Sequence, residues 1–191
     1  MSESAAKKVN SKTLVLCAMF AALSCVLSPF TIPIGPIPIG FAHIVIFTCA
    51  GMLGAKYATV SQTVFVLLGM AGLPVFSGLR GGLGVITGPT GGFIIGYILC
   101  AFVVGLLIQW LGKTIPKLIL AMYVGWGVTY ICGVAWFMIV MRDNEAYGLS
   151  IPGLIAVLNA CVIPFLIGDV FKTLLSALLV NRLQFITEDP S

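Results

Sequence analysis

The charged residues that fall deepest within an apolar stretch are Asp169 and Lys172, three positions apart. On a helix this spacing places both side chains on one face. A carboxylate accepts hydrogen bonds and an ammonium donates them, so together they could hold a polar ligand group in an apolar cavity. Ionisable groups in such stretches are costly and usually functional, which favours this interpretation. A mutually neutralising ion pair that fixes helix packing is the alternative.

Three further polar side chains could reach the same ligand. Arg80 lies in a Gly-rich stretch whose backbone could approach a ligand closely, and its guanidinium suits a carboxylate. A solvated loop charge is the other interpretation of Arg80. Asn159 precedes Asp169 by ten residues, so both contact one ligand only if that ligand is elongated. His43 is either a ligand contact or a polar residue at the end of a predicted helix.

Aromatic residues could wall an apolar pocket around these groups, although aromatic side chains in membrane spans more often serve packing or interface anchoring. The candidates are Phe76, Phe93, Tyr97 and Trp126.

The sequence offers no materials for catalysis. His43 is the only histidine, and Asp169 stands alone among carboxylates in the apolar stretches, so we expect no catalytic residue and no metal site. The segment 111–114 resembles the tail of a phosphate-binding loop, but the required upstream glycine is Leu107. We therefore expect neither an enzyme nor a bound cofactor.

Composition identifies the elements that must position these residues. Hydrophobic residues make up 60% of the 191 and charged residues only 8%, where soluble domains carry about a quarter. This composition indicates a surface that faces lipid. The basic residues are scattered and do not form a nucleic-acid-binding patch. We predict an all-α integral membrane protein, one domain over residues 1–191. Its six transmembrane helices are expected at about 13–29, 41–55, 57–73, 92–111, 117–141 and 153–181.

Lysines determine the predicted topology. Reading 41–73 as one span would bury Lys56 in lipid, so we predict a helical hairpin with Lys56 in its turn. The positive-inside rule then places most lysines and both termini in the cytoplasm. The loops 30–40, 74–91 and 142–152 then lie on the exterior side. Pro- and Gly-rich backbone that enters the membrane must be buried in protein or line a cavity, so we expect a cavity at this side.

Ala18 and Ala22 form a pair of small residues one turn apart in the first predicted span. Such a strip lets another helix approach closely. It could receive a partner subunit or serve packing inside the bundle.

With these residues in view, the chain resembles the BioY family, the biotin-specific substrate-capture (S) components of energy-coupling factor transporters. Residues 32–39 resemble the family's Pro-rich first outer loop. Residues 72–78 and 88–97 resemble its third loop and the start of its fourth helix, and Pro164–Lys172 resembles the PFxxGDxxK signature of its sixth. Two positions depart from the pattern: His43 replaces an uncharged polar residue, and Ile167 replaces a proline.

The resemblance implies an S-component fold that binds biotin from outside and delivers it for ATP-driven uptake. The implied partners are a transmembrane T component and two ATP-binding subunits. The strip of Ala18 and Ala22 is our candidate docking surface for such a partner. A stand-alone carrier for a vitamin-like molecule is the alternative function, although no internal repeat supports it. The expected ligand-binding residues are Asp169, Lys172, Arg80, Phe76, Thr90, Gly91, Tyr97, Asn159 and His43.

Overall fold

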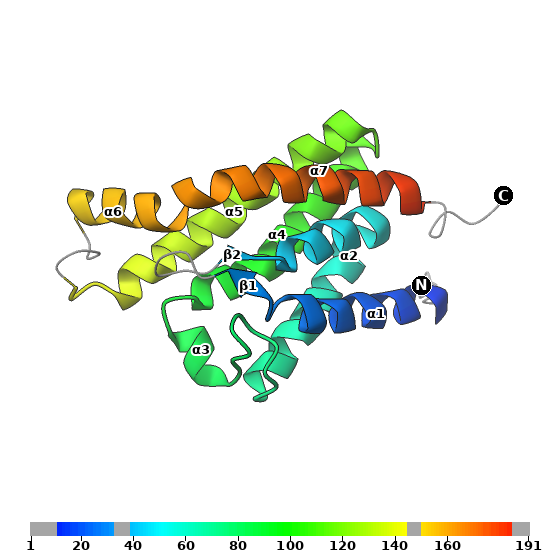
Figure 1. The fold of residues 1–191 in the computed structure, drawn as a ribbon. Helices are drawn as coiled ribbons and strands as arrows, with labels where there is room; N and C mark the ends of the chain where they lie inside the picture. Colours follow the sequence, from blue (N-terminus) through cyan, green and yellow to red (C-terminus); the bar gives the residue numbers. More distant parts are fainter. Residues whose placement is uncertain (1–10, 33–38, 145–149, 185–191) are drawn as a thin grey trace, which may run out of the picture.

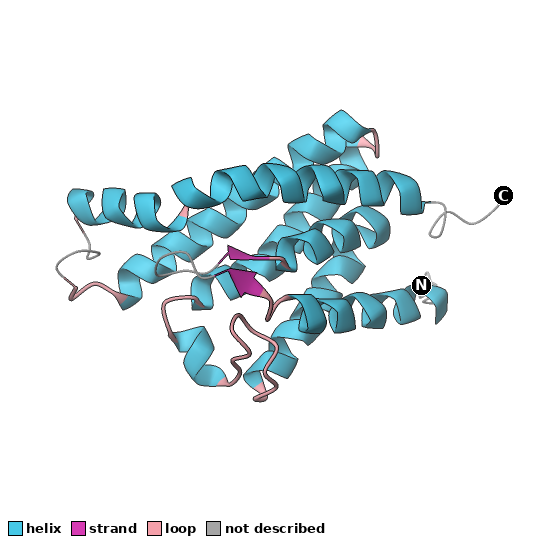
Figure 2. Ribbon diagram, viewed as in Figure 1, coloured by secondary structure: helices cyan, strands magenta, loops and turns pink. Residues whose placement is uncertain are grey.

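The computed structural model describes residues 11–32, 39–144 and 150–184, and these residues form a bundle of helices (Figure 1). Helix dominates, and the strands in the described part are one short antiparallel pair (Figure 2). The prediction of an all-α chain is confirmed. The elements are α1 (Ser11–Leu27), β1 (Thr31–Ile32), β2 (Ile39–Gly40), α2 (Ala42–Met70), α3 (Leu83–Thr87), α4 (Gly91–Leu111), α5 (Ile115–Val140), α6 (Ile151–Cys161), the 3-10 helix η1 (Ile163–Phe165) and α7 (Leu166–Leu183).

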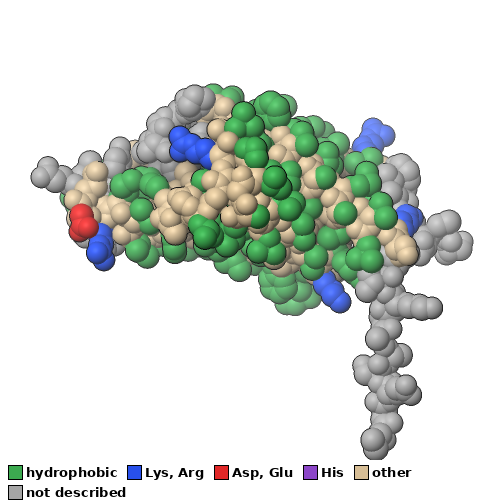
Figure 3. All heavy atoms as spheres, turned by 90° about the horizontal axis from the view of Figure 1, so that it is seen from below, with side chains coloured by type: hydrophobic (Ala, Val, Ile, Leu, Met, Phe, Trp, Pro, Cys, Tyr) green, Lys and Arg blue, Asp and Glu red, His purple; other side chains and the backbone are tan. Residues whose placement is uncertain are grey.

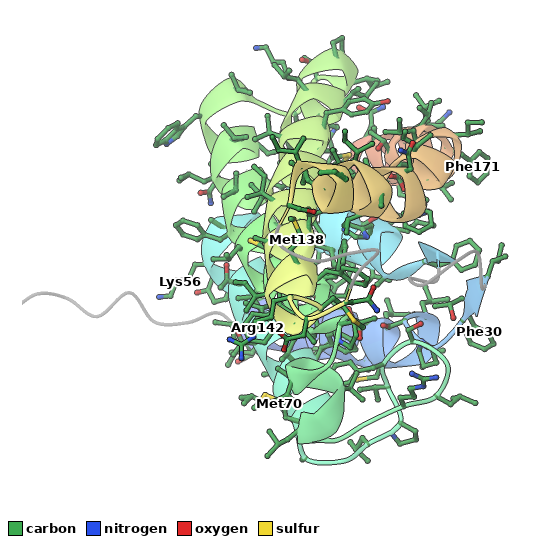
Figure 4. The ribbon with its side chains drawn as sticks, turned by 90° about the vertical axis from the view of Figure 1, so that its left-hand side faces the viewer. Phe30, Lys56, Met70, Met138, Arg142 and Phe171 are labelled. Atoms are coloured by element: carbon green, nitrogen blue, oxygen red, sulfur yellow. The ribbon has the colours of Figure 1, made fainter. Side chains whose placement is uncertain are left out.

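Helix α2 consists of two helical segments that meet at a break. Gly54 has φ 72° and ψ −179°, a left-handed conformation that favours glycine. The segments run in different directions on either side of it (Figure 1). Lys56 lies two residues beyond the break, is exposed and projects away from the bundle (Figure 4). The chain therefore reverses at Gly54, and Lys56 sits in the first turn of the second segment.

Small residues let α2 pack closely against α4 and α5. A methyl group on Gly105 of α4 would come within 2.5 Å of the Ala55 backbone. In lipid the hydrophobic effect does not drive helices together, so the close packing of their backbones is a main source of helix association. The largest group of buried apolar side chains joins α2, α4 and α5 and includes Ile46, Phe47 and Met122. This core forms the rigid support of the site.

The outer surface of the bundle is apolar. Apolar side chains cover the middle of the face shown in Figure 3, while charged ones gather toward its two ends. Ile167, Ile131 and Phe171 are 86%, 72% and 67% exposed, which would be unfavourable in water but suits lipid. Phe171 points away from the bundle in Figure 4. Among the described helices, Gly91–Leu111 and Ile115–Val140 are each long and apolar enough to cross a membrane, and Ala42–Met70 reaches that length only when its two segments are counted together.

The two ends of the bundle differ. The described ends of the chain and the turn between α4 and α5 lie at one end, and the β1–β2 pair and α3 lie toward the other (Figure 1). The positive-inside rule assigns the first end to the cytoplasm, because Lys113 and Lys117 flank that turn.

The last predicted span is interrupted. Helix α6 ends at Cys161, a 3-10 turn covers Ile163–Phe165, and α7 starts at Leu166. Pro164 explains the interruption, because proline removes a backbone donor from a helix. The interruption gives α7 its own N-terminus, with Asp169 in its first turn. The structure also adds the short helix α3 within the stretch 74–91, which we predicted to be entirely loop.

Candidate functional site

A cavity opens between the helices at the end of the bundle that carries the short strands. The space not filled by atoms, counted together with the open mouth, is about 710 Å³. The loops, α2, α4, α5, η1 and α7 all contribute to its wall. The lining residues are Ser28, Thr31, Gly40, His43, Phe76, Ser77, Val85, Thr90, Phe93, Ile94, Tyr97, Trp126, Thr129, Tyr130, Phe165, Asp169 and Lys172.

Asp169 and Lys172 supply the charge in this lining. Lys172 Nζ lies 3.0 Å from Asp169 Oδ1, and both side chains are at most 5% exposed. The hydroxyl of Tyr130 on α5 donates a hydrogen bond to Asp169 Oδ2. Each carboxylate oxygen therefore has a donor, as a charge held in an apolar environment requires. The position of Asp169 in the first turn of α7 adds the favourable field of the helix N-terminus.

Trp126 of α5 joins α5 to α7 behind this pair. Its indole N–H donates to Thr173 Oγ1 at 3.0 Å, and Thr173 in turn donates to the Asp169 carbonyl oxygen at 2.7 Å. Lys172 Nζ lies 5.1 Å from the centre of the Trp126 ring, within the range of a cation–π interaction. These contacts fix the ammonium on two sides, so its position in the cavity wall is set before a ligand arrives.

His43, in the first turn of α2, completes an aromatic stack. Its ring lies 3.8 Å from that of Trp126, at an angle of 27°, and Tyr130 stacks on Trp126 at 5.7 Å. Tyr97 meets the His43 ring edge-on at 5.1 Å. Nε2 of His43 lies 3.3 Å from Thr129 Oγ1. The imidazole is therefore held rigidly in the wall.

The loops at the mouth are tied to one another. Ser77 donates to Thr31 Oγ1 at 3.2 Å, and the Gly78 amide donates to the Pro29 carbonyl at 3.2 Å. These bonds join the segment after α1 to the segment after α2. Phe76, 1% exposed, packs edge-on against Phe65 and lines the cavity from this second segment.

The structure brings six of the nine predicted ligand-binding residues into the cavity lining: Asp169, Lys172, Phe76, Thr90, Tyr97 and His43. Phe93 and Trp126, expected as possible wall residues, also line it. Three predicted residues do not line it. Arg80 is exposed and pairs through its backbone with Phe76. Gly91 is buried against Ile86, and exposed Asn159 donates to the Ile155 carbonyl of its own helix at 2.9 Å.

Sequence reasoning did not single out Tyr130 and Thr129. Tyr130 follows Trp126 by four residues, a spacing that places both on one face of a helix, and this signal could have identified it. Thr31 and Ser77 carry no comparable pattern, because only the fold brings their loops together.

Ala18 and Ala22 are exposed on α1. The buried residues of this helix are Cys17, Phe20, Ala21 and Ser24, on its other side. Ser24 pairs with the buried Gln62 of α2, whose Nε2 donates to its Oγ at 3.1 Å. Ala18 and Ala22 therefore do not pack inside the described bundle.

The lining suits binding more than bond cleavage. A largely aromatic wall carries one ion pair, two phenols, an imidazole and several aliphatic hydroxyl groups. Within the described residues, no group of three or more His, Cys, Asp or Glu side chains could hold a metal ion. The arrangement can hold a mostly apolar molecule by a polar end that offers both donors and acceptors.

Comparisons with known proteins identify the class of protein. The sequence model of the BioY family matches residues 2–189. A biotin transporter BioY from Thermotoga maritima is 33% identical over 173 residues, covering 91% of this chain and 96% of the relative. A biotin transporter BioY from Rhizobium etli is 31% identical over 182 residues, covering 90% and 92%.

A solved structure supports the same assignment. The crystal structure of the S-component for biotin from an ECF-type ABC transporter superposes with a TM-score of 0.80 at 29% identity, covering 96% of this chain and 95% of that one. These relatives are transporters of the prokaryotic membrane, so the expectations of a multi-pass membrane protein and of a non-enzyme are confirmed. The chain belongs to the BioY family and has the fold of an ECF-transporter S-component.

Proposed function

We propose that this chain binds biotin at the exterior end of the bundle and delivers it for ATP-driven uptake. The observation that carries the proposal is the buried Asp169–Lys172 pair in an otherwise apolar, aromatic cavity that opens opposite the lysine-rich end. Biotin matches such a lining, because it has an apolar bicyclic body and chain, a ureido group with donors and an acceptor, and a carboxylate.

Asp169 is the proposed acceptor for a ureido N–H group. Lys172 and Arg80 are the two candidate cations for the ureido oxygen and the carboxylate. Lys172 lies in the lining and Arg80 lies on the exposed loop that carries Phe76. Phe76, Tyr97, Thr90 and His43 would contact the body and chain of the ligand.

Delivery requires partners that supply energy. We propose a transmembrane T component and two ATP-binding subunits, as the relationship to an ECF-type S-component supports. The exposed strip of Ala18 and Ala22 on α1 is the proposed docking surface, because small side chains allow a second helix to approach closely in lipid.

The test is a calorimetric titration of the purified chain in detergent with biotin, and with thiamine and riboflavin as competitors of other chemistry. We expect that biotin binds and that thiamine and riboflavin do not. Binding of another vitamin in place of biotin would contradict the proposal. Flux measurements in vesicles separate the two modes of transport. Biotin flux through the chain alone, without ATP, would favour a stand-alone carrier, whereas flux that requires the energising subunits supports delivery.

A further inference from the structure

His43 presents one hydrogen-bonding atom to the cavity, and its neighbours determine which kind. Nε2 lies 3.3 Å from Thr129 Oγ1, while Thr129 Oγ1 itself donates to the Gly125 carbonyl at 3.1 Å. A hydroxyl has one proton, so Thr129 can only accept from His43. The tautomer that satisfies both contacts carries the imidazole proton on Nε2.

The second ring nitrogen faces open space. No described residue hydrogen-bonds Nδ1 of His43. If Nδ1 were also fully buried, it would be a buried polar atom without a partner, but among the described residues Ser61 Oγ is the one side-chain atom of that kind. Nδ1 therefore keeps accessible surface. His43 as a whole is 7% exposed and lines the cavity, so that surface belongs to the cavity.

The ring is uncharged in this setting. It stacks on Trp126, the same indole that holds the Lys172 ammonium, and the described structure shows no carboxylate hydrogen-bonded to the imidazole. A second buried cation beside Lys172 without its own counter-ion would be strongly unfavourable. A neutral imidazole protonated on Nε2 has a lone pair on Nδ1, which makes that atom an acceptor.

We propose that Nδ1 of His43 accepts a hydrogen bond from an N–H group of the ligand and selects for ligands that carry this donor. The inference rests on the proposed function in naming biotin, whose ureido group has two N–H groups. Asp169 is the acceptor for one and His43 for the other. A site built to meet a donor rejects analogues that lack it, because its own polar atom is then left unpaired.

Two amide substitutions, each of which keeps a polar atom near one ring nitrogen, separate this role from a structural one. His43→Asn keeps an acceptor oxygen close to the position of Nδ1, and His43→Gln keeps an amide donor close to Nε2 that can still reach Thr129. We expect the Gln variant to bind biotin at least about tenfold more weakly than the Asn variant, as expected for a lost buried hydrogen bond. Equal affinities, or weaker binding by the Asn variant, would overturn the proposal. Thermal unfolding in detergent shows whether either variant is misfolded.

A ligand series gives an independent measurement. The two mono-N-methylated biotins each remove one ureido donor. The unsubstituted chain should bind one of the two methylated biotins more weakly than the other. The ratio of the two dissociation constants should fall to near unity in the Gln variant. Discrimination that persists in the Gln variant means that the methyl group is excluded by shape, and the proposal fails.

His43 is the only histidine in the sequence, so ¹⁵N-histidine labelling reports on this ring alone. We expect one protonated nitrogen, Nε2, and one unprotonated nitrogen, Nδ1, whose signal moves on addition of biotin. A proton on Nδ1, or on both nitrogens, overturns the proposal whether or not biotin binds. A correct tautomer in a chain that does not bind biotin would instead remove the proposed function and, with it, the assignment of the ligand N–H.

Discussion

The hydroxyl of Tyr130 on α5 donates to the carboxylate of Asp169 on α7, a contact between residues 39 positions apart that closes one side of the cavity. Helix α7 has few other polar ties to α5, and among the described residues Trp126 supplies one of them through Thr173. The phenol therefore does two things. It orients the carboxylate toward Lys172, and it holds the two helices that form the polar wall.

Tyr130→Phe should weaken biotin binding and lower thermal stability together. The substitution leaves Asp169 Oδ2 without its donor, and a buried charged acceptor that loses a partner costs about 1–3 kcal/mol. Thermal unfolding and calorimetric titration in detergent measure the two effects. Tyr123→Phe is a matched control, because Tyr123 lies on the same helix but is 44% exposed. If both phenylalanine variants behave alike, the Tyr130–Asp169 bond contributes nothing to the site.

Asp169→Asn and Lys172→Met should each reduce affinity for biotin by about 1–3 kcal/mol, or roughly 5- to 150-fold. Each alters one proposed ligand contact and removes the opposite charge from the 3.0 Å ion pair. The bundle should still fold, because water in the open cavity can meet the remaining group. Lys56→Met, at an exposed lysine, controls for loss of charge. Unchanged affinity with lowered stability would make the pair purely structural.

Arg80→Ala should raise the dissociation rate of biotin more than it lowers the association rate. The guanidinium lies on the exposed loop next to Phe76, so it would act as part of the cover that retains a bound ligand. The alanine variant keeps the backbone pairing between residues 76 and 80, which isolates the effect of the side chain. Radioligand dissociation gives the rate, and a rate equal to that of the unsubstituted chain would show Arg80 to be a solvated loop charge.

Ala18→Leu combined with Ala22→Leu should block assembly with the energising subunits and leave biotin binding intact. Both residues are exposed on α1, and neither lines the cavity. The added side chains would hold a partner helix away from the α1 backbone. Co-purification and ligand titration of the same preparation measure the two properties. Val124→Leu on α5, at another exposed position, is the control for added bulk. Assembly at the normal level would place the docking surface elsewhere.

The helical architecture could be predicted from sequence because the lipid environment acts on composition directly. Long apolar stretches must be helical where no water can satisfy the backbone, and prolines and lysines mark their ends. The reversal near residue 55 followed from the cost of burying Lys56. Its location at Gly54 did not, because the choice depends on how closely α2 and α4 approach at Ala55 and Gly105.

The charged part of the site could be predicted for the same reason. Asp169 and Lys172 stood out because charge is rare in apolar helices, whereas Asn159 followed only from its shared helix. The break at Pro164 separates α6 from α7, and Asn159 bonds back to its own helix. The pairing of Thr31 with Ser77 lay outside sequence reasoning, because two loops 46 residues apart meet only after the bundle has formed.

The break at Gly54 also has a consequence for how the chain is made. The first segment of α2, residues 42–53, is about 18 Å long at 1.5 Å per residue, shorter than a hydrocarbon core of about 30 Å. Such a segment does not hold itself across a bilayer. We therefore expect it to enter the bilayer together with residues 55–70, as one unit. The exposed Lys56 marks the end of this unit that stays on the side of synthesis.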